Sequence, residues 1–160
     1  MTIEIGIPDT ARRSVADTLN HLLADEYVLF TKTRNYHWNV TGPQFSQLHT
    51  FFEDQYEKLD DFIDDIAERA RSLGASAAGS LAEFTKLARV KEQPGQSLDA
   101  EGMIRQLLAD HESLVRQLRE DAVAVTDKHQ DIGTGDFLTG LLEDHEKMAW
   151  MLRAYLTKTA

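Results

Sequence analysis

An apolar stripe between residues 45 and 73 is the feature that most constrains what this chain can fold into. Its members recur three and four residues apart over about eight turns, which is the spacing of one face of an α-helix. A Thr41-Gly42-Pro43 stop precedes the stripe and Gly74 follows it. A long helix with one apolar face has to bury that face against other helices, so the stripe predicts a helical bundle. The stripe consists of Phe45, Leu48, Phe52, Tyr56, Leu59, Ile63, Ile66, Ala70 and Leu73.

Three more stripes of the same period predict three more long helices, and the whole chain is predicted to be all-α. The first helix is expected to start at Pro8-Asp9-Thr10, and the Asp131–Asp136 stretch is expected to separate the last two. The stripes are Val15, Leu19, Leu22, Leu29 and Phe30; then Ile104, Leu107, Leu108, Leu114, Leu118, Ala122 and Val125; then Leu138, Leu141, Leu142, Met148, Leu152 and Leu156.

The lengths of the connections predict the topology. The first and third connections are short, so each joins an antiparallel helix pair, whereas the second runs from about Gly74 to Ser97. Within it, residues 81–89 form a short helical pattern. Two antiparallel pairs joined by one long crossover make the ferritin-like four-helix bundle. We expect a single domain over residues 1–160, with residues 1–9 as an N-terminal tail.

Composition excludes several classes of protein. The 160 residues include no cysteine, which excludes disulfides and zinc–thiolate sites. Residues 1–13 lack the pattern of a signal peptide and no stretch resembles a membrane span, so we expect a cytoplasmic protein with no membrane partner. The formal net charge of −10 repels nucleic acid and attracts cations, although it also simply favours solubility.

The second helix also carries an acidic face. At about 100° per residue, His49 and five carboxylates fall within about 100° of one another. Like charges at this spacing destabilise a helix, so a cation is expected to neutralise them. A histidine with carboxylates suits iron or zinc. The alternative is a solvated acidic face. The carboxylates are Glu53, Glu57, Asp60, Asp64 and Glu68.

Distance limits how this face could bind metal. Glu53 and Asp64 are about 16 Å apart along one helix, so they cannot share an ion within one chain. Either His49/Glu53 and Asp64/Glu68 are separate sites, or two copies of the helix run antiparallel about a twofold axis and complete two identical sites. The sequence lacks the Glu-x-x-His motif of single-chain di-iron bundles, and this favours the shared site.

His37 ends the first helix only a few residues before the second begins. Antiparallel packing of the two helices can bring His37 and His49 to the same level. His37 is therefore a candidate second imidazole ligand, with Trp38 beside it.

The segment NYHWNVTGPQFSQLHTFFEDQYEKLDDFIDDIAERARSLG, residues 35–74, resembles the signature of the Dps family, the mini-ferritins. The resemblance rests on the His-Trp pair, on the spacing of twelve to the next histidine and on the downstream Asp-x-x-x-Glu. It continues through the crossover into TGDFLTGLLEDHEKMAWMLRAYL, residues 134–156, and thus covers nearly the whole chain after about residue 10.

The resemblance implies a hollow homododecamer that binds Fe(II) between twofold-related subunits, oxidises it, preferably with hydrogen peroxide, and stores ferric oxide. Such a protein is a ferroxidase that protects against oxidative stress. Carried over by position, the di-iron ligands are His37, His49 and Glu53 of one chain with Asp64 and Glu68 of its partner. The family usually has aspartate where this chain has Glu53. Zinc could occupy the site in the isolated protein.

The resemblance also suggests roles for residues near the centre and the pores. Trp38, with Tyr36 nearby, could take up stray oxidising equivalents, although a packing role is an equal alternative. Acidic residues where the third helix ends line threefold pores in the family, and here Asp121 and Asp131 are the candidates. The alternative for both is helix capping or a solvated turn.

The remaining histidines and the N-terminal residues lead to further predictions. His111 and His145, each inside an Asp-His-Glu run, could form a second metal site, although a hydrogen-bonded core histidine is the commoner role on an apolar stripe. His21 and His129 are expected at the surface. Residues 1–10 contain no Lys or Arg, so we expect weak or absent DNA binding. The rival function is a structural DNA-condensing shell with an incidental metal site.

Overall fold

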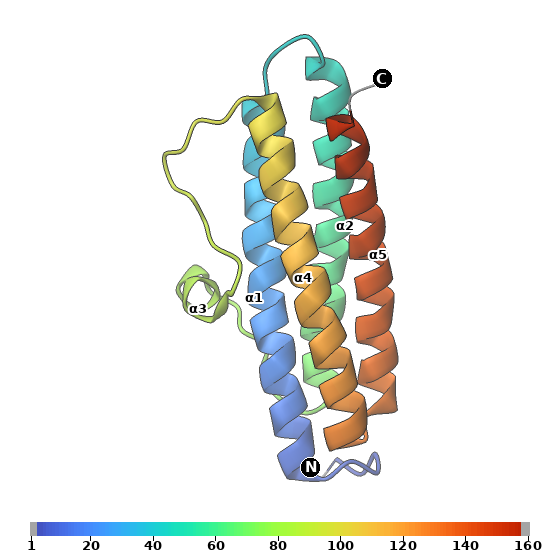
Figure 1. Cartoon of the computed structure of the whole chain (residues 1–160). Helices are drawn as coiled ribbons and strands as arrows, with labels where there is room; N and C mark the ends of the chain where they lie inside the picture. Colours follow the sequence, from blue (N-terminus) through green and yellow to red (C-terminus); the bar gives the residue numbers. More distant parts are fainter. Residues whose placement is uncertain (1–2, 158–160) are drawn as a thin grey trace.

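Four long helices pack as a bundle in the computed structural model, which describes residues 3–157 (Figure 1). A short fifth helix lies outside the bundle, and the described residues contain no strand, so the all-α prediction is confirmed. In chain order the helices are α1 (Asp9–Asn39), α2 (Phe45–Ser72), α3 (Leu81–Leu87), α4 (Ala100–His129) and α5 (Ile132–Leu156).

The helices pair as the connection lengths predict. α1 packs along α2, and α4 packs along α5. The turn between α1 and α2 includes Gly42 at φ +114, a backbone conformation that favours glycine. The long crossover carries α3, which packs on the outer side of α1 (Figure 1). The segment Ile3–Pro8 precedes α1; residues 1–2 of the predicted tail, and 158–160 at the other end of the predicted domain, lie outside the described residues.

The start of the last helix differs from the prediction. We expected residues 131–136 to form a linker, but α5 begins at Ile132, immediately after Gln130 in the left-handed conformation and Asp131. Asp131 Oδ1 accepts a hydrogen bond of 2.9 Å from the amide of Thr134 and so caps the helix.

One glycine of this stretch, Gly135, therefore serves helix packing rather than a loop. A Cβ at Gly135 would collide with the side chain of Thr126 on α4. The absence of a side chain at Gly135 thus allows the first turn of α5 to lie close against the end of α4.

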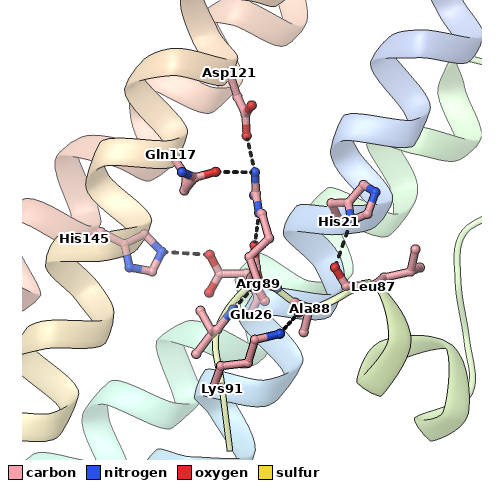
Figure 2. A network of polar contacts seen from close by, with 11 residues as sticks. His21, Glu26, Leu87, Ala88, Arg89, Lys91, Gln117, Asp121 and His145 are labelled. Carbon is pink, nitrogen blue, oxygen red and sulfur yellow. Dashed lines mark hydrogen bonds and ion pairs between the residues drawn. The ribbon is translucent and has the colours of Figure 1, made fainter.

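The crossover is fastened to the bundle by buried polar contacts. Asp25 of α1 accepts the Nε–H of Arg89 at 2.7 Å and the amide of Val90 at 2.9 Å. The same guanidinium donates to Gln117 and Asp121 of α4 (Figure 2). These contacts fix the chain where it leaves α3 and returns towards α4.

The four histidines outside the candidate centre have varied surroundings. His111 and His145 are buried and hydrogen-bonded to each other, which confirms the core alternative for them. His21 is exposed, as predicted, and donates Nδ1–H to the carbonyl of Leu87. His129 is half-buried against Ser14, so the prediction of a surface position was only partly right. None of the described helices has the length and apolarity needed to cross a membrane.

Candidate metal centre

His37 and His49 meet where α1 ends and α2 begins. Their rings stack with centroids 3.7 Å apart and an interplanar angle of 22°. His37 Nδ1 lies 2.8 Å from the backbone carbonyl oxygen of His49, and His49 Nδ1 lies 2.8 Å from the carbonyl oxygen of His37. The antiparallel pairing of the two helices makes this reciprocal arrangement possible.

The reciprocal contacts determine which ring nitrogen is available. A carbonyl oxygen can only accept, so each Nδ1 carries the proton and donates it. In the neutral rings both Nε2 atoms are then lone-pair donors. A metal-binding histidine usually has its second nitrogen anchored in this way, because the anchor fixes both the tautomer and the ring orientation. His37 is buried and His49 half-buried, so both side chains are also held by packing.

Glu53 lies one turn after His49 on the same side of α2 and is half-buried. Tyr56 donates its hydroxyl to Glu53 Oε1 at 3.3 Å, and its ring stands edge-on to His37 with centroids 5.3 Å apart. Burial and the neighbouring Glu53 carboxylate raise the pKa of Tyr56, so the phenol stays protonated and can donate. Tyr56 therefore bridges the histidine pair and the carboxylate, a contact that the sequence analysis did not include.

Trp38 is the most solvent-exposed aromatic residue near the pair, with 63% of its surface accessible. The guanidinium carbon of Arg34 lies 5.4 Å from the centroids of both the Trp38 and Tyr56 rings, and 5.7 Å from that of Phe30. Arg34 is thus held among three aromatic rings by cation–π attraction. The predicted packing role of Trp38 within its own chain is small, since most of the indole faces solvent.

Asp64 and Glu68 occupy the other end of the acidic face and are exposed. Within residues 3–157 no group of three or more His, Asp or Glu side chains is placed to hold a metal ion. One chain therefore presents two separate donor sets, namely His37 at the end of α1 with His49 and Glu53 of α2, and Asp64 with Glu68 further along α2. The distance argument from the sequence likewise separates the two sets, because one ion cannot bind to both within one chain.

The family model for the ferritin-like domain matches residues 16–160. A Bacillus anthracis relative named DNA protection during starvation protein 2 is 37% identical over 147 residues, which are 91% of this chain and 99% of the relative. The chain belongs to the Dps family. A low temperature-induced protein of Nostoc is 50% identical over 96% of this chain and 86% of its own length.

Solved structures agree with this assignment of the Dps chain. The Dps protein of Vibrio cholerae, described as a member of a broad superfamily of ferritin-like diiron-carboxylate proteins, superimposes with a TM-score of 0.91 at 34% identity. The match covers 98% of this chain and 97% of that one. The ferritin-like fold expected from the crossover topology is confirmed by these neighbours.

The two predicted pore residues have partners within the chain. Asp131 is 2% exposed, caps α5, and pairs with Arg69 of α2 at 3.1 Å. Asp121 pairs with Arg89 at 3.1 Å and is half-buried. The helix-cap alternative is therefore realised for Asp131. A pore role for either residue stays a prediction, because it depends on an assembly of several subunits.

Tyr36, for which a quenching role beside Trp38 and a core-packing role are equal alternatives from the sequence, is buried. Burial and the charge of Asp110 raise the pKa of Tyr36 to about 12. Its environment is thus one of core packing, with its ring 6.4 Å from that of Phe52.

Proposed function

We propose that this Dps protein is a mini-ferritin with ferroxidase activity. It binds Fe(II) between twofold-related subunits, oxidises it, preferably with hydrogen peroxide, and stores ferric oxide in a hollow dodecamer. The observation that supports this most directly is the reciprocal anchoring of His37 and His49. It leaves both Nε2 lone pairs free, and no hydrogen bond within residues 3–157 uses them.

The donor set suits iron. Two imidazoles and carboxylates without thiolates are the ligands of non-haem iron centres. In the proposed centre His37, His49 and Glu53 bind iron from one subunit, and Asp64 and Glu68 of the partner subunit complete the site. Glu53 in place of the usual aspartate has a longer arm and still reaches an ion.

Pairing two ferrous ions controls the redox chemistry. Two Fe(II) donate two electrons to one peroxide, its O–O bond breaks, and two protons are taken up to give two waters and two Fe(III). A single electron would instead release hydroxyl radical. We assign to the anchored histidines the task of holding two ions close enough to act together. Trp38, exposed beside them, is proposed to take up any stray one-electron oxidation.

The first test is anaerobic loading with Fe(II) followed by one addition of hydrogen peroxide. We expect fast ferric absorbance, with iron co-eluting in a particle of about twelve subunits. The variant His37→Ala/His49→Ala should lose both, whereas His21→Ala/His129→Ala, which removes two histidines elsewhere, should keep them. Iron that stays free and oxidises no faster than in buffer would contradict the proposal.

A mixing experiment tests the shared site. The variants His37→Ala/His49→Ala and Asp64→Asn/Glu68→Gln are each expected to be inactive. Reassembled together, half of the dimers combine one of each chain, and one of the two sites in such a dimer is intact. About one quarter of wild-type sites should therefore return. If both donor sets act within single chains, mixing restores nothing.

The rival function, a DNA-condensing shell, is suggested by the names of relatives such as the Bacillus anthracis protein. Twelve chains at −10 would carry about −120 before counterions, which opposes binding to phosphate. Arg12 is also unavailable, since it is buried and donates to the carbonyl of Leu73. We therefore propose weak or absent DNA binding at neutral pH and moderate salt; a clear gel shift there would favour the rival. A cytoplasmic location stays a prediction.

A further inference from the structure

A chain of three hydrogen-bonded side chains crosses the bundle core, away from the candidate metal centre. His145 of α5 contacts Glu26 of α1 through Nε2 at 2.9 Å, and contacts His111 of α4 through Nδ1 at 2.9 Å. All three residues are 0% exposed. Figure 2 shows the Glu26 carboxylate and the His145 ring directed at each other from their helices. The chain therefore joins the α1/α2 pair to the α4/α5 pair.

The charged side chains next to Glu26 and His111 form ion pairs with other residues. On α1 the neighbouring Asp25 binds Arg89 of the crossover. On α4 the neighbouring Asp110 binds Lys32 of α1.

The α2 side of the chain presents an apolar neighbour. The Phe62 ring of α2 lies with its centroid 5.5 Å from the centroid of the His145 ring. Among residues 3–157 no other titratable side chain forms a hydrogen bond with Glu26, His145 or His111. These three residues therefore share protons only with one another.

The geometry suits a proton rather than a metal ion. Glu26 and His111 contact opposite nitrogens of His145, so their donor atoms do not converge on one point. The described residues accordingly include no three-ligand cluster here. Two atoms at the ends, Glu26 Oε2 and His111 Nε2, have no hydrogen-bond partner. The chain is thus closed at both ends and cannot pass a proton along to a further side chain.

Counting protons gives the capacity of the chain. With both rings neutral, His145 Nε2–H donates to Glu26, and His111 Nδ1–H donates to His145. One added proton can be held if His145 becomes an imidazolium beside the Glu26 carboxylate; the Nδ1 hydrogen bond then reverses and His111 carries its own proton on Nε2. A further proton either sets two Nδ1–H groups against each other or neutralises Glu26 and leaves a buried cation unpaired. Both outcomes are costly for fully buried side chains.

We propose that Glu26, His145 and His111 form an acid-sensitive latch between the two helix pairs, which holds at neutral pH and opens when His111 must also be protonated. This latch does not depend on the proposed iron chemistry. It would set the lowest pH at which the subunit keeps its bundle.

The pKa of His111 agrees with this direction. Burial, followed by the nearby His145, lowers the pKa of His111 well below its usual value. Its folded pKa is below its unfolded pKa, so the unfolded chain takes up a proton that the fold excludes. Stability is therefore full above about pH 6.5 and decreases as pH falls below that value, until the folded pKa is reached.

Urea unfolding of the assembled protein at one concentration, from pH 7.5 to 5.0, tests the latch. Each excluded proton should raise the unfolding constant about tenfold per pH unit below about 6.5. In the variant Glu26→Leu/His111→Leu/His145→Leu, the pH dependence of the unfolding constant should be weaker by the contribution of about one proton. It is expected to fold, because buried ionic triads are often replaceable by apolar residues. The control His21→Gln, at an exposed histidine, should keep the wild-type slope. An equal slope in wild type and triple variant would overturn the proposal.

A second measurement needs no core variant. Solid-state NMR of protein labelled with ¹⁵N-histidine reports the protonation of each ring nitrogen. We expect His111 to stay neutral down to the pH at which unfolding begins. A protonated His111 in the folded protein near pH 6.5 would show that the core tolerates the extra proton, and the latch would be wrong.

Discussion

The substitution Lys32→Met is expected to cause one of the largest losses of stability in this chain. Lys32 Nζ lies 2.7 Å from Asp110 Oδ2 and 2.8 Å from the carbonyl oxygen of Lys91. Lys32 and Asp110 are only 7% and 9% exposed. Without the ammonium group, the Asp110 carboxylate retains Gln106 as its side-chain donor, at 3.3 Å, and the Lys91 carbonyl loses this donor.

The magnitude follows from the burial of the pair. Removing one partner of a buried ion pair costs about 3–5 kcal/mol, because the remaining charge is left without compensation. A typical domain has a stability of about 5–15 kcal/mol, so Lys32→Met would remove a large share. The crossover should loosen too, since Lys32 holds the carbonyl of Lys91 just after the segment that Asp25 fastens.

The loss should depend on pH. Burial raises the pKa of Asp110 even in the wild type, where Lys32 opposes the increase. Lys32→Met removes this opposition, so the folded pKa of Asp110 rises further above its unfolded value. A carboxyl of this kind destabilises the fold at pH values above its folded pKa, where it must stay charged. The penalty then shrinks as pH falls through that pKa and the group protonates.

Urea unfolding at pH 7 and pH 5 measures both effects. The double variant Lys32→Met/Asp110→Leu should recover most of the loss, because neither charge remains buried. The control Lys58→Met removes half of an exposed pair with Asp144 at 3.6 Å, and should cost less than about 1 kcal/mol. A Lys32→Met loss no larger than this control, or one that does not shrink towards pH 5, would refute the reasoning.

Three further predictions concern the end of α4 and the metal centre. Gly135→Ala should lower the free energy of unfolding by about 1–3 kcal/mol, because its Cβ meets the Thr126 side chain, and adding Thr126→Ala should recover much of this in urea titrations. Asp131→Ala removes the α5 cap and its ion pair with Arg69, so thermal unfolding should show a loss of about 1–2 kcal/mol or more. Trp38→Phe should raise the radical-adduct signal in spin trapping during peroxide turnover, and an unchanged signal would remove the quenching role.

The sequence predicted the helices well because each long helix repeats one apolar period over many turns. The misplaced start of α5 shows the limit of that method. Two glycines within residues 131–136 resemble a turn, but Gly135 is required by the close approach of Thr126, a contact 9 residues away in sequence. Apolar periodicity describes one helix at a time, whereas the need for glycine at position 135 comes from contact with another helix, α4.

Buried charges were missed for a related reason. Glu26 stands four residues after Leu22 and three before Leu29, and therefore on the first apolar stripe. A carboxylate at such a position is predicted to lie at the solvent-exposed edge of the helix unless its partner is known. The partner of Glu26 is His145, which is 119 residues away in sequence. The signal that could have found it was the pairing of an acidic residue on one stripe with a histidine on another.

The candidate metal centre shows how far one chain can specify a site that we propose to be shared by two. The histidine half was accessible to reasoning from the sequence, because the short turn between α1 and α2 forces His37 and His49 to one level, and the structure stacks them. Asp64 and Glu68 remain exposed at helical spacing, where like charges repel by a few tenths of a kcal/mol per pair. Their carboxylates form no ion pair with any residue from 3 to 157. A bound cation would relieve this repulsion, and in the proposed centre the Nε2 atoms of a second subunit would share it. The anchored histidines and the unpaired carboxylates thus both favour a twofold interface. The mixing experiment tests this, because it places the substituted histidines and the substituted carboxylates in different chains.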